Sequence, residues 1–130
     1  MAITNANGKI CYIEIPAEDV ARSAEFYRAV FGWVIRTRSH GATAFDDGVE
    51  VSGTFVRGRP PARETALLIY VMVADAEATL KKIAAHGGEI VEPVHPGAPD
   101  IVARFRDPAG NLMGIYQEQA LAGSPAGGEA

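Results

Sequence analysis

The same order of structural signals occurs twice in this chain of 130 residues. Each occurrence opens with a β-rich segment and continues with an aspartate suited to cap a helix, Asp19 in the first and Asp75 in the second. The offset between the aspartates (75 − 19 = 56) also separates Gly32 from Gly88, which end the two predicted helices. A unit of about 50 residues is too small to bury one face of a sheet by itself. The repeat therefore predicts two similar modules that pack together.

Apolar periodicity places one helix in each unit. Apolar residues recur at helical spacing from Val20 to Phe31 and again from Ala76 to Ile83. Strands are predicted before each helix and after it, at residues 10–16, 33–38, 43–47, 49–56, 67–73, 88–94, 100–107 and 111–118. The prediction is an α+β fold with two β-α-β-β-β modules in one domain. The modules span about residues 9–57 and 66–118, and the tail 119–130 is predicted to be disordered because it has few apolar groups.

Composition excludes several classes of protein. A net charge of −4 does not suit a general nucleic-acid-binding protein, which needs a basic face. No apolar run is long enough to cross a membrane, and the first residues lack the order of a signal peptide. The single cysteine, Cys11, indicates a reducing compartment and is predicted to be a small core residue. We therefore expect a cytoplasmic protein with no membrane or nucleic-acid partner.

Two motifs resemble a known family. "DVARSAEFYRAVFGW" at 19–33 resembles the first helix and following strand of the vicinal oxygen chelate superfamily, and "FRDPAGNLMGIYQ" at 105–117 resembles its closing hairpin. That superfamily includes glyoxalase I, extradiol dioxygenases and the fosfomycin and bleomycin resistance proteins. The resemblance covers residues 9–118. It implies that the strands of each module curl into half of a cup, a mixed and antiparallel sheet that a homodimer completes in many members.

The resemblance also implies a metal site that this chain does not reproduce. Metal-dependent members hold one divalent ion in the cup through histidine, glutamate or glutamine. The corresponding positions here are Tyr12, its repeat mate Leu68, Gly114 and a fourth position near Gly53. Leucine and glycine side chains offer no donor atom, and a neutral phenol is a poor ligand. We expect no metal and no other cofactor, with a divalent metal on displaced ligands as the alternative.

Strand alternation predicts which side chains line the cup. The expected ligand-binding residues are Tyr12, Glu14, Leu68, Tyr70, Arg104, Gly114 and Tyr116. Aromatic walls with a few polar groups are typical of a small-molecule pocket, and Gly114 would leave room in it. Two structural interpretations stay open: Glu14 and Arg104 could form an ion pair, and the tyrosines could fill the cup as a second core.

Three functions follow from this site. The first is a protein that binds a small organic ligand without metal, as bleomycin resistance proteins bind theirs. The second is a metal-dependent glyoxalase-type lyase or dioxygenase whose ligands are displaced. The third is a metal-free enzyme, for which Glu14 is the candidate catalytic residue because it is the one obvious carboxylate in the cup.

Overall fold

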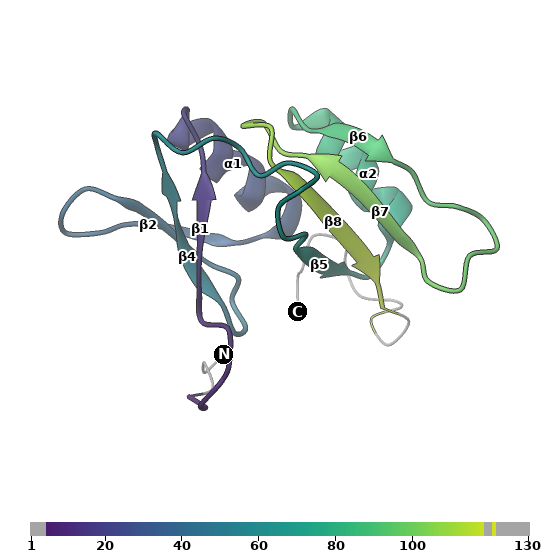
Figure 1. The fold of residues 1–130 in the computed structure, drawn as a ribbon, viewed down its shortest axis with the longest axis horizontal. Helices are drawn as coiled ribbons and strands as arrows, with labels where there is room; N and C mark the ends of the chain where they lie inside the picture. The colour runs from purple at the N-terminus through teal and green to yellow at the C-terminus, as the bar shows by residue number, and fades with distance from the viewer. Residues whose placement is uncertain (1–4, 119–120, 122–130) are drawn as a thin grey trace.

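The computed structural model describes residues 5–118 and Leu121 and contains the two predicted modules. The predicted disordered tail lies, apart from Leu121, outside the described residues. The elements are β1 (Tyr12–Pro16), α1 (Val20–Phe31), β2 (Val34–Thr37), β3 (Thr43–Asp46), β4 (Ser52–Val56), β5 (Tyr70–Val73), α2 (Ala76–Ala85), β6 (Glu89–Glu92), β7 (Val102–Arg106) and β8 (Leu112–Gln117). Figure 1 shows the modules side by side, each helix lying against its own sheet.

The predicted caps fix both helices. Asp19 accepts a hydrogen bond from the backbone of Arg22, and Asp75 accepts one from Ala78, which satisfies donors that a helix start leaves unpaired. Gly32 ends α1 in the left-handed conformation (φ 74°) that favours glycine. In the second module the cap is His86, one residue before the predicted glycine pair.

The strands form two mixed four-stranded sheets with the same topology. The first sheet has the order β1-β4-β3-β2 and the second the order β5-β8-β7-β6. In each, the strand before the helix pairs in parallel with the last strand, and the other pairs are antiparallel. This matching topology confirms the repeat and the predicted α+β class.

One core serves both modules. It combines the helices with the helix-facing residues of both sheets, including Phe45, Phe55, Phe105 and Ile115. The ring of Phe105 lies 6.0 Å from that of Phe26 and so joins the second sheet to the first helix. Since the core lies on the helix side, the opposite side of each sheet points to solvent. We call that side the open face.

The closing turn ties the modules together through buried polar groups. The Tyr27 hydroxyl of α1 donates to the Asp107 carboxylate (2.7 Å), and the Asn111 amide donates both to Asp107 and to the carbonyl of Pro16. Asn111 also accepts from the backbone of Ala62 in the linker. Because buried polar groups need partners, the turn is held in one position relative to β1 and α1.

Cys11 is not the small core residue that the sequence predicted. It precedes β1 and is exposed, because the regular strand starts only at Tyr12. Among the described residues, no helix is long and apolar enough to cross a membrane.

Candidate ligand-binding site

The open face of the first sheet carries Tyr12 and Glu14, as alternation predicts. Their neighbours on β1, Ile13 and Ile15, point to the core. Tyr12 is 44% exposed. Glu14 pairs with Arg59 of the linker, and both side chains are about half exposed. Arg59 lies in the linker between the modules, and the sequence analysis did not identify it as a partner of Glu14.

A second ion pair lies on the same open face. Arg36 of β2 donates to the Asp46 carboxylate of β3 (2.7 Å), and the Ser52 hydroxyl of β4 donates to it as well. The hydrogen bond from Arg36 is the main reason that the pKa of Asp46 is lowered. Sequence reasoning did not select these residues, although the alternation within residues 34–37 and 43–46 places Arg36 and Asp46 on one face.

The open face of the second sheet brings four predicted residues together. Tyr70, Gly114 and Arg104 are direct neighbours across β5, β8 and β7, and Tyr116 lies one row further on. Leu68 precedes β5 and is partly buried. The face is open: Tyr70 is 44% exposed.

The room expected at Gly114 is already occupied. A Cβ atom built at this glycine would lie 2.7 Å from two ring atoms of Tyr70. The Tyr70 ring therefore takes the space that a side chain at this position would need. Gly114 allows the Tyr70 ring to pack close to the backbone of β8, and it leaves no open space there.

The structure does not contain the ion pair between Glu14 and Arg104 that was the alternative to a ligand-binding role. Glu14 pairs with Arg59, whereas the Arg104 guanidinium lies 3.7 Å from Glu92, its cross-strand neighbour on β6. Glu92 also contacts the His95 ring at 3.0 Å. Glu14 and Arg104 lie on different sheets, and each has another partner: Arg59 of the linker for Glu14 and Glu92 of β6 for Arg104.

The positions expected to hold a metal do not suit one. The fourth, expected near Gly53, corresponds to Thr54. The strands β4 and β8 each follow a five-residue loop (47–51 and 107–111), so Thr54 and Gly114 are equivalent as the third residue of each strand. A Cβ at Gly53 would instead point at the core ring of Phe45. The Thr54 hydroxyl donates to the Thr43 carbonyl. Within the described part of the chain, no group of three or more histidine, cysteine or acidic residues could hold a metal ion.

A cavity lies on the other side of the first sheet, between the modules. Its volume is about 490 Å³. Core residues of the first module form one wall, the strand β5 forms the other, and the loop 47–51 forms part of its rim. Of the predicted site residues, Tyr70 contributes to it. The cavity was not predicted from the sequence, because it depends on how the modules pack.

With this geometry in view, comparison with known proteins decides the family. Residues 9–115 match the profile of the Glyoxalase/Bleomycin resistance protein/Dioxygenase superfamily. The chain belongs to this superfamily. The family assigned from the helix and closing-turn motifs is thereby confirmed.

Individual proteins resemble the chain over most of its length. A glyoxylase-like domain-containing protein of Didymella fabae is 30% identical over 84% of this chain and 93% of its own. The anthracycline biosynthesis protein DnrV of Streptomyces peucetius is 27% identical over 92% of this chain. The chain spans only 50% of that relative.

Solved structures confirm the glyoxalase fold. The fosfomycin resistance protein FosX of Mesorhizobium loti superposes with a TM-score of 0.69 over 88% of this chain and 95% of its own. The two sequences are 15% identical, so this likeness concerns the fold alone.

Proposed function

We propose that the protein binds a small organic ligand on the open faces of its sheets without the divalent metal of its metal-dependent relatives. The observation that carries the proposal is the placement of the Tyr70 ring over Gly114, at the position where metal-dependent relatives commonly have a glutamate. Tyr12, Thr54 and Leu68 at the other positions supply no carboxylate or imidazole. The residues present therefore do not fit a divalent metal.

The side chains on the open faces favour an aromatic ligand. Tyr12, Tyr70 and Tyr116 offer rings on which a planar molecule can stack, and Arg104 offers a cation that can bind an acidic group or the face of a ring. The name of the Streptomyces peucetius relative, an anthracycline biosynthesis protein, supports a polycyclic aromatic ligand. We propose this ligand class for the open faces.

Closure of the cup would require a second copy of the chain. In one chain the open faces point away from the shared core and leave Tyr12 and Tyr70 44% exposed. A homodimer that brings one open face of each copy together would bury these rings around a ligand. We therefore propose a homodimer.

Binding alone is favoured over catalysis by the environment of Glu14. For Glu14 to act as a general base, its carboxylate must reach a proton of the ligand. In this structure the carboxylate accepts from Arg59, which would have to move aside. The lyase and dioxygenase alternatives need the metal that the open-face residues do not fit.

The test is a melting screen of chelator-treated protein with polycyclic aromatic acids, whose acidic group suits Arg104. A compound present at about a hundredfold excess over its Kd should stabilise the folded state by about 2.7 kcal/mol, which for this size is a shift of several degrees. Tyr12→Ala and Arg104→Ala should abolish the shift. The matched control is Leu67→Ala, since Leu67 is 92% exposed and lies outside the proposed site. A shift that persists in both site variants would refute binding at the open faces.

A further inference from the structure

The cavity between the modules is built differently from the open faces. Its walls include Ile13, Ile15 and Trp33 from the first module and Val71 and Val73 from the second. These side chains belong to the helix-facing side of the two sheets or pack against the core there. The cavity is therefore separate from the proposed open-face site, with Tyr70 and Met72 of the edge strand β5 as a shared boundary.

Its size and lining suit an apolar molecule. Ligand pockets commonly measure about 300–1,000 Å³ and are lined mainly by hydrophobic and aromatic side chains. The cavity, at about 490 Å³, falls in this range. Met113 also lines it, and its flexible thioether adapts to ligands of different outline. A ring system of two or three fused rings would fill such a space.

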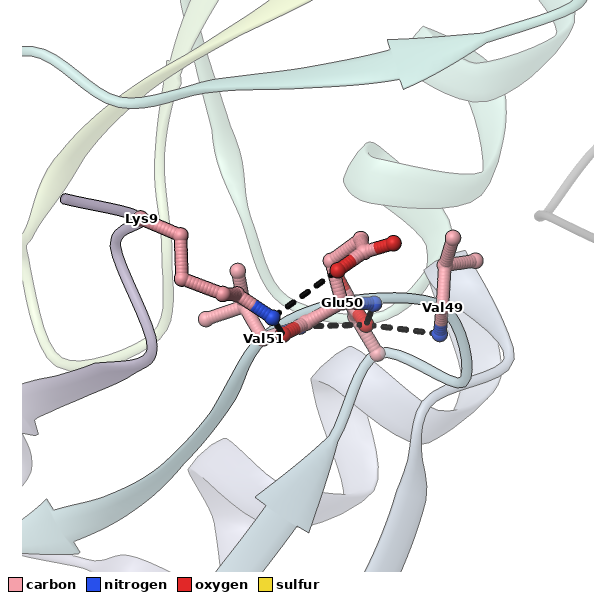
Figure 2. Close-up of polar contacts among 5 residues, drawn as sticks. Lys9, Val49, Glu50 and Val51 are labelled. Atoms are coloured by element: carbon pink, nitrogen blue, oxygen red, sulfur yellow. Dashed lines mark hydrogen bonds and ion pairs between the residues drawn. The ribbon is translucent and has the colours of Figure 1, made fainter. Parts of the chain in front are cut away.

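The rim of the cavity is held in place. Asp47 accepts hydrogen bonds from the backbone of Val49, Glu50 and Val51 at 2.8, 2.9 and 3.0 Å. The Lys9 ammonium donates to the carbonyl and to the carboxylate of Glu50, and Figure 2 shows it reaching Glu50 beside Val49 and Val51. A rim that is already ordered loses little entropy when a ligand enters.

The charges at the rim select against anions. The charged side chains that line the cavity are both carboxylates, Asp47 and Glu50. Lys9 offsets part of the Glu50 charge, so Asp47 contributes most of the remaining negative field. A ligand with its own negative charge would be repelled, whereas a neutral or amine-bearing ligand would not.

We propose that this cavity is a second binding site, for a neutral or cationic aromatic molecule. Its walls exclude water from the rings, and its acidic rim contacts the polar or basic end of the ligand. The site needs neither the open faces nor a second copy of the chain.

Two fluorescent probes that share one ring system test the proposal. N-phenyl-1-naphthylamine is neutral, and 8-anilinonaphthalene-1-sulfonate adds a negative charge to the same skeleton. The neutral probe should bind with one equivalent per chain, and the sulfonate should bind at least about tenfold more weakly, roughly 1.4 kcal/mol. Asp47→Asn keeps an oxygen for the three backbone donors but removes the charge. This variant should therefore reduce the difference in affinity between the neutral probe and the sulfonate. Equal affinity for both probes would contradict the charge selection.

Variants of the cavity wall and the NMR signal of the single tryptophan test where the neutral probe binds. Val71→Phe should fill part of the cavity and weaken the neutral probe by about tenfold or more. The matched control is Val34→Phe, because Val34 lies on the open face of β2 and is 56% exposed; it should leave affinity unchanged. Trp33 is the sole tryptophan of the chain and lines the cavity, so its indole N–H signal in an NMR spectrum should shift on binding.

The controls separate this proposal from the preceding one. If Val71→Phe does not fold, Val49→Phe at the half-exposed rim replaces it. Tyr12→Ala and Arg104→Ala should leave binding of the neutral probe unchanged. Loss of probe binding in these two variants, with an unmoved Trp33 signal, would place the probe on the open faces and overturn the cavity site. Unchanged affinity in a folded Val71→Phe or Val49→Phe variant would overturn it as well.

Discussion

Asp107 is a buried carboxylate without a cationic partner among its hydrogen bonds. It is 3% exposed, and its oxygens accept from the Tyr27 hydroxyl, from the Asn111 amide, and from the backbone of Ala109 and Asn111. Burial raises the pKa of Asp107, and the hydrogen bonds from Asn111 and Tyr27 act in the opposite direction. Desolvation also raises the pKa of Tyr27, so the phenol stays a donor at neutral pH. The free energy of unfolding therefore depends on whether Asp107 is protonated.

The direction of this dependence follows from linkage. Because the pKa of Asp107 is raised in the folded state, its contribution to stability is fully present below the ordinary value of 3.8 and is lost as pH rises through the folded value. Removing a donor to the carboxylate raises the folded pKa further and increases the cost of ionisation.

Tyr27→Phe is the variant that tests this account. At about pH 7 it should lower the free energy of unfolding by about 1.5–3 kcal/mol, the usual value of a hydrogen bond to a charged group. At about pH 4 the loss should be smaller, because protonation removes the charge that needs the donor. Urea unfolding at both pH values measures the difference. Tyr12→Phe, on the exposed face, serves as the control, and an equal loss at both pH values would show that the effect comes from packing.

At the scale of single residues, the sequence predicted which face of a strand a side chain lies on better than it predicted the residue with which that side chain pairs. Alternation correctly separated Tyr12 and Glu14 from Ile13 and Ile15. It could not show that Glu14 pairs with Arg59, because the linker brings Arg59 back across 45 residues of sequence. Long-range contacts of this kind depend on the path of an irregular segment, which no periodic pattern records.

At the scale of elements, one close contact between Tyr70 and Gly114 favours the observed register of β5 and β8. Tyr70 and Gly114 are parallel register partners, and the Tyr70 ring lies over the glycine. Register matters because a shift by one residue would turn every side chain of β8 to the other face. The contact thus favours the observed register.

A double-mutant cycle measures this contact. In the Tyr70→Ala background, Gly114→Ala should stabilise the protein by about 0.5–1 kcal/mol, because glycine is unfavourable inside a strand. With Tyr70 present the same change should give no gain or should destabilise, since the new Cβ would lie 2.7 Å from the ring. Thermal unfolding of the four proteins gives the coupling. An equal stabilisation in both backgrounds would mean that the ring does not need the glycine.

The elements themselves were largely predictable. Caps, apolar periodicity and turn residues identified both helices and every strand of the two modules. The fourth metal position shows the limit: the strand was predicted, but the sequence placed this position only near Gly53, because the exact register depends on the loop 47–51. The shape of that loop depends on three backbone hydrogen bonds to the Asp47 carboxylate. The spacing of residues in the sequence does not reveal these bonds.

At the scale of the whole molecule, two sheets share one core and leave two open faces. The open faces carry exposed large side chains, among them Tyr12, Val34, Tyr70 and Met72. The strands β1 and β5 are also sheet edges, whose unpaired backbone groups invite pairing. The internal repeat predicted the two modules. The cavity between them depends on how the modules pack and had no signal in the sequence.

A homodimer is the expected outcome of these exposed surfaces. Light scattering at micromolar concentration should give twice the chain mass of 13.8 kDa. Replacing Val34 and Met72 with lysine should shift the protein toward the monomer, because charges on an open face resist burial. Val49→Lys is the matched control, as Val49 is equally exposed but lies on the loop 47–51. A monomer in the unmodified protein would contradict the dimer.

The most direct test of the account is the metal content of the protein and its thermal response to metals. The purified protein should contain no stoichiometric zinc, nickel, manganese or iron, and added metal should not raise its Tm. A folded-state metal site at about a hundredfold excess over its Kd would add about 2.7 kcal/mol, a shift of several degrees. Tyr12, Thr54, Leu68 and Gly114 offer no such site. One equivalent of tightly bound metal, lost with a chelator together with ligand binding or turnover, would contradict the metal-independent account.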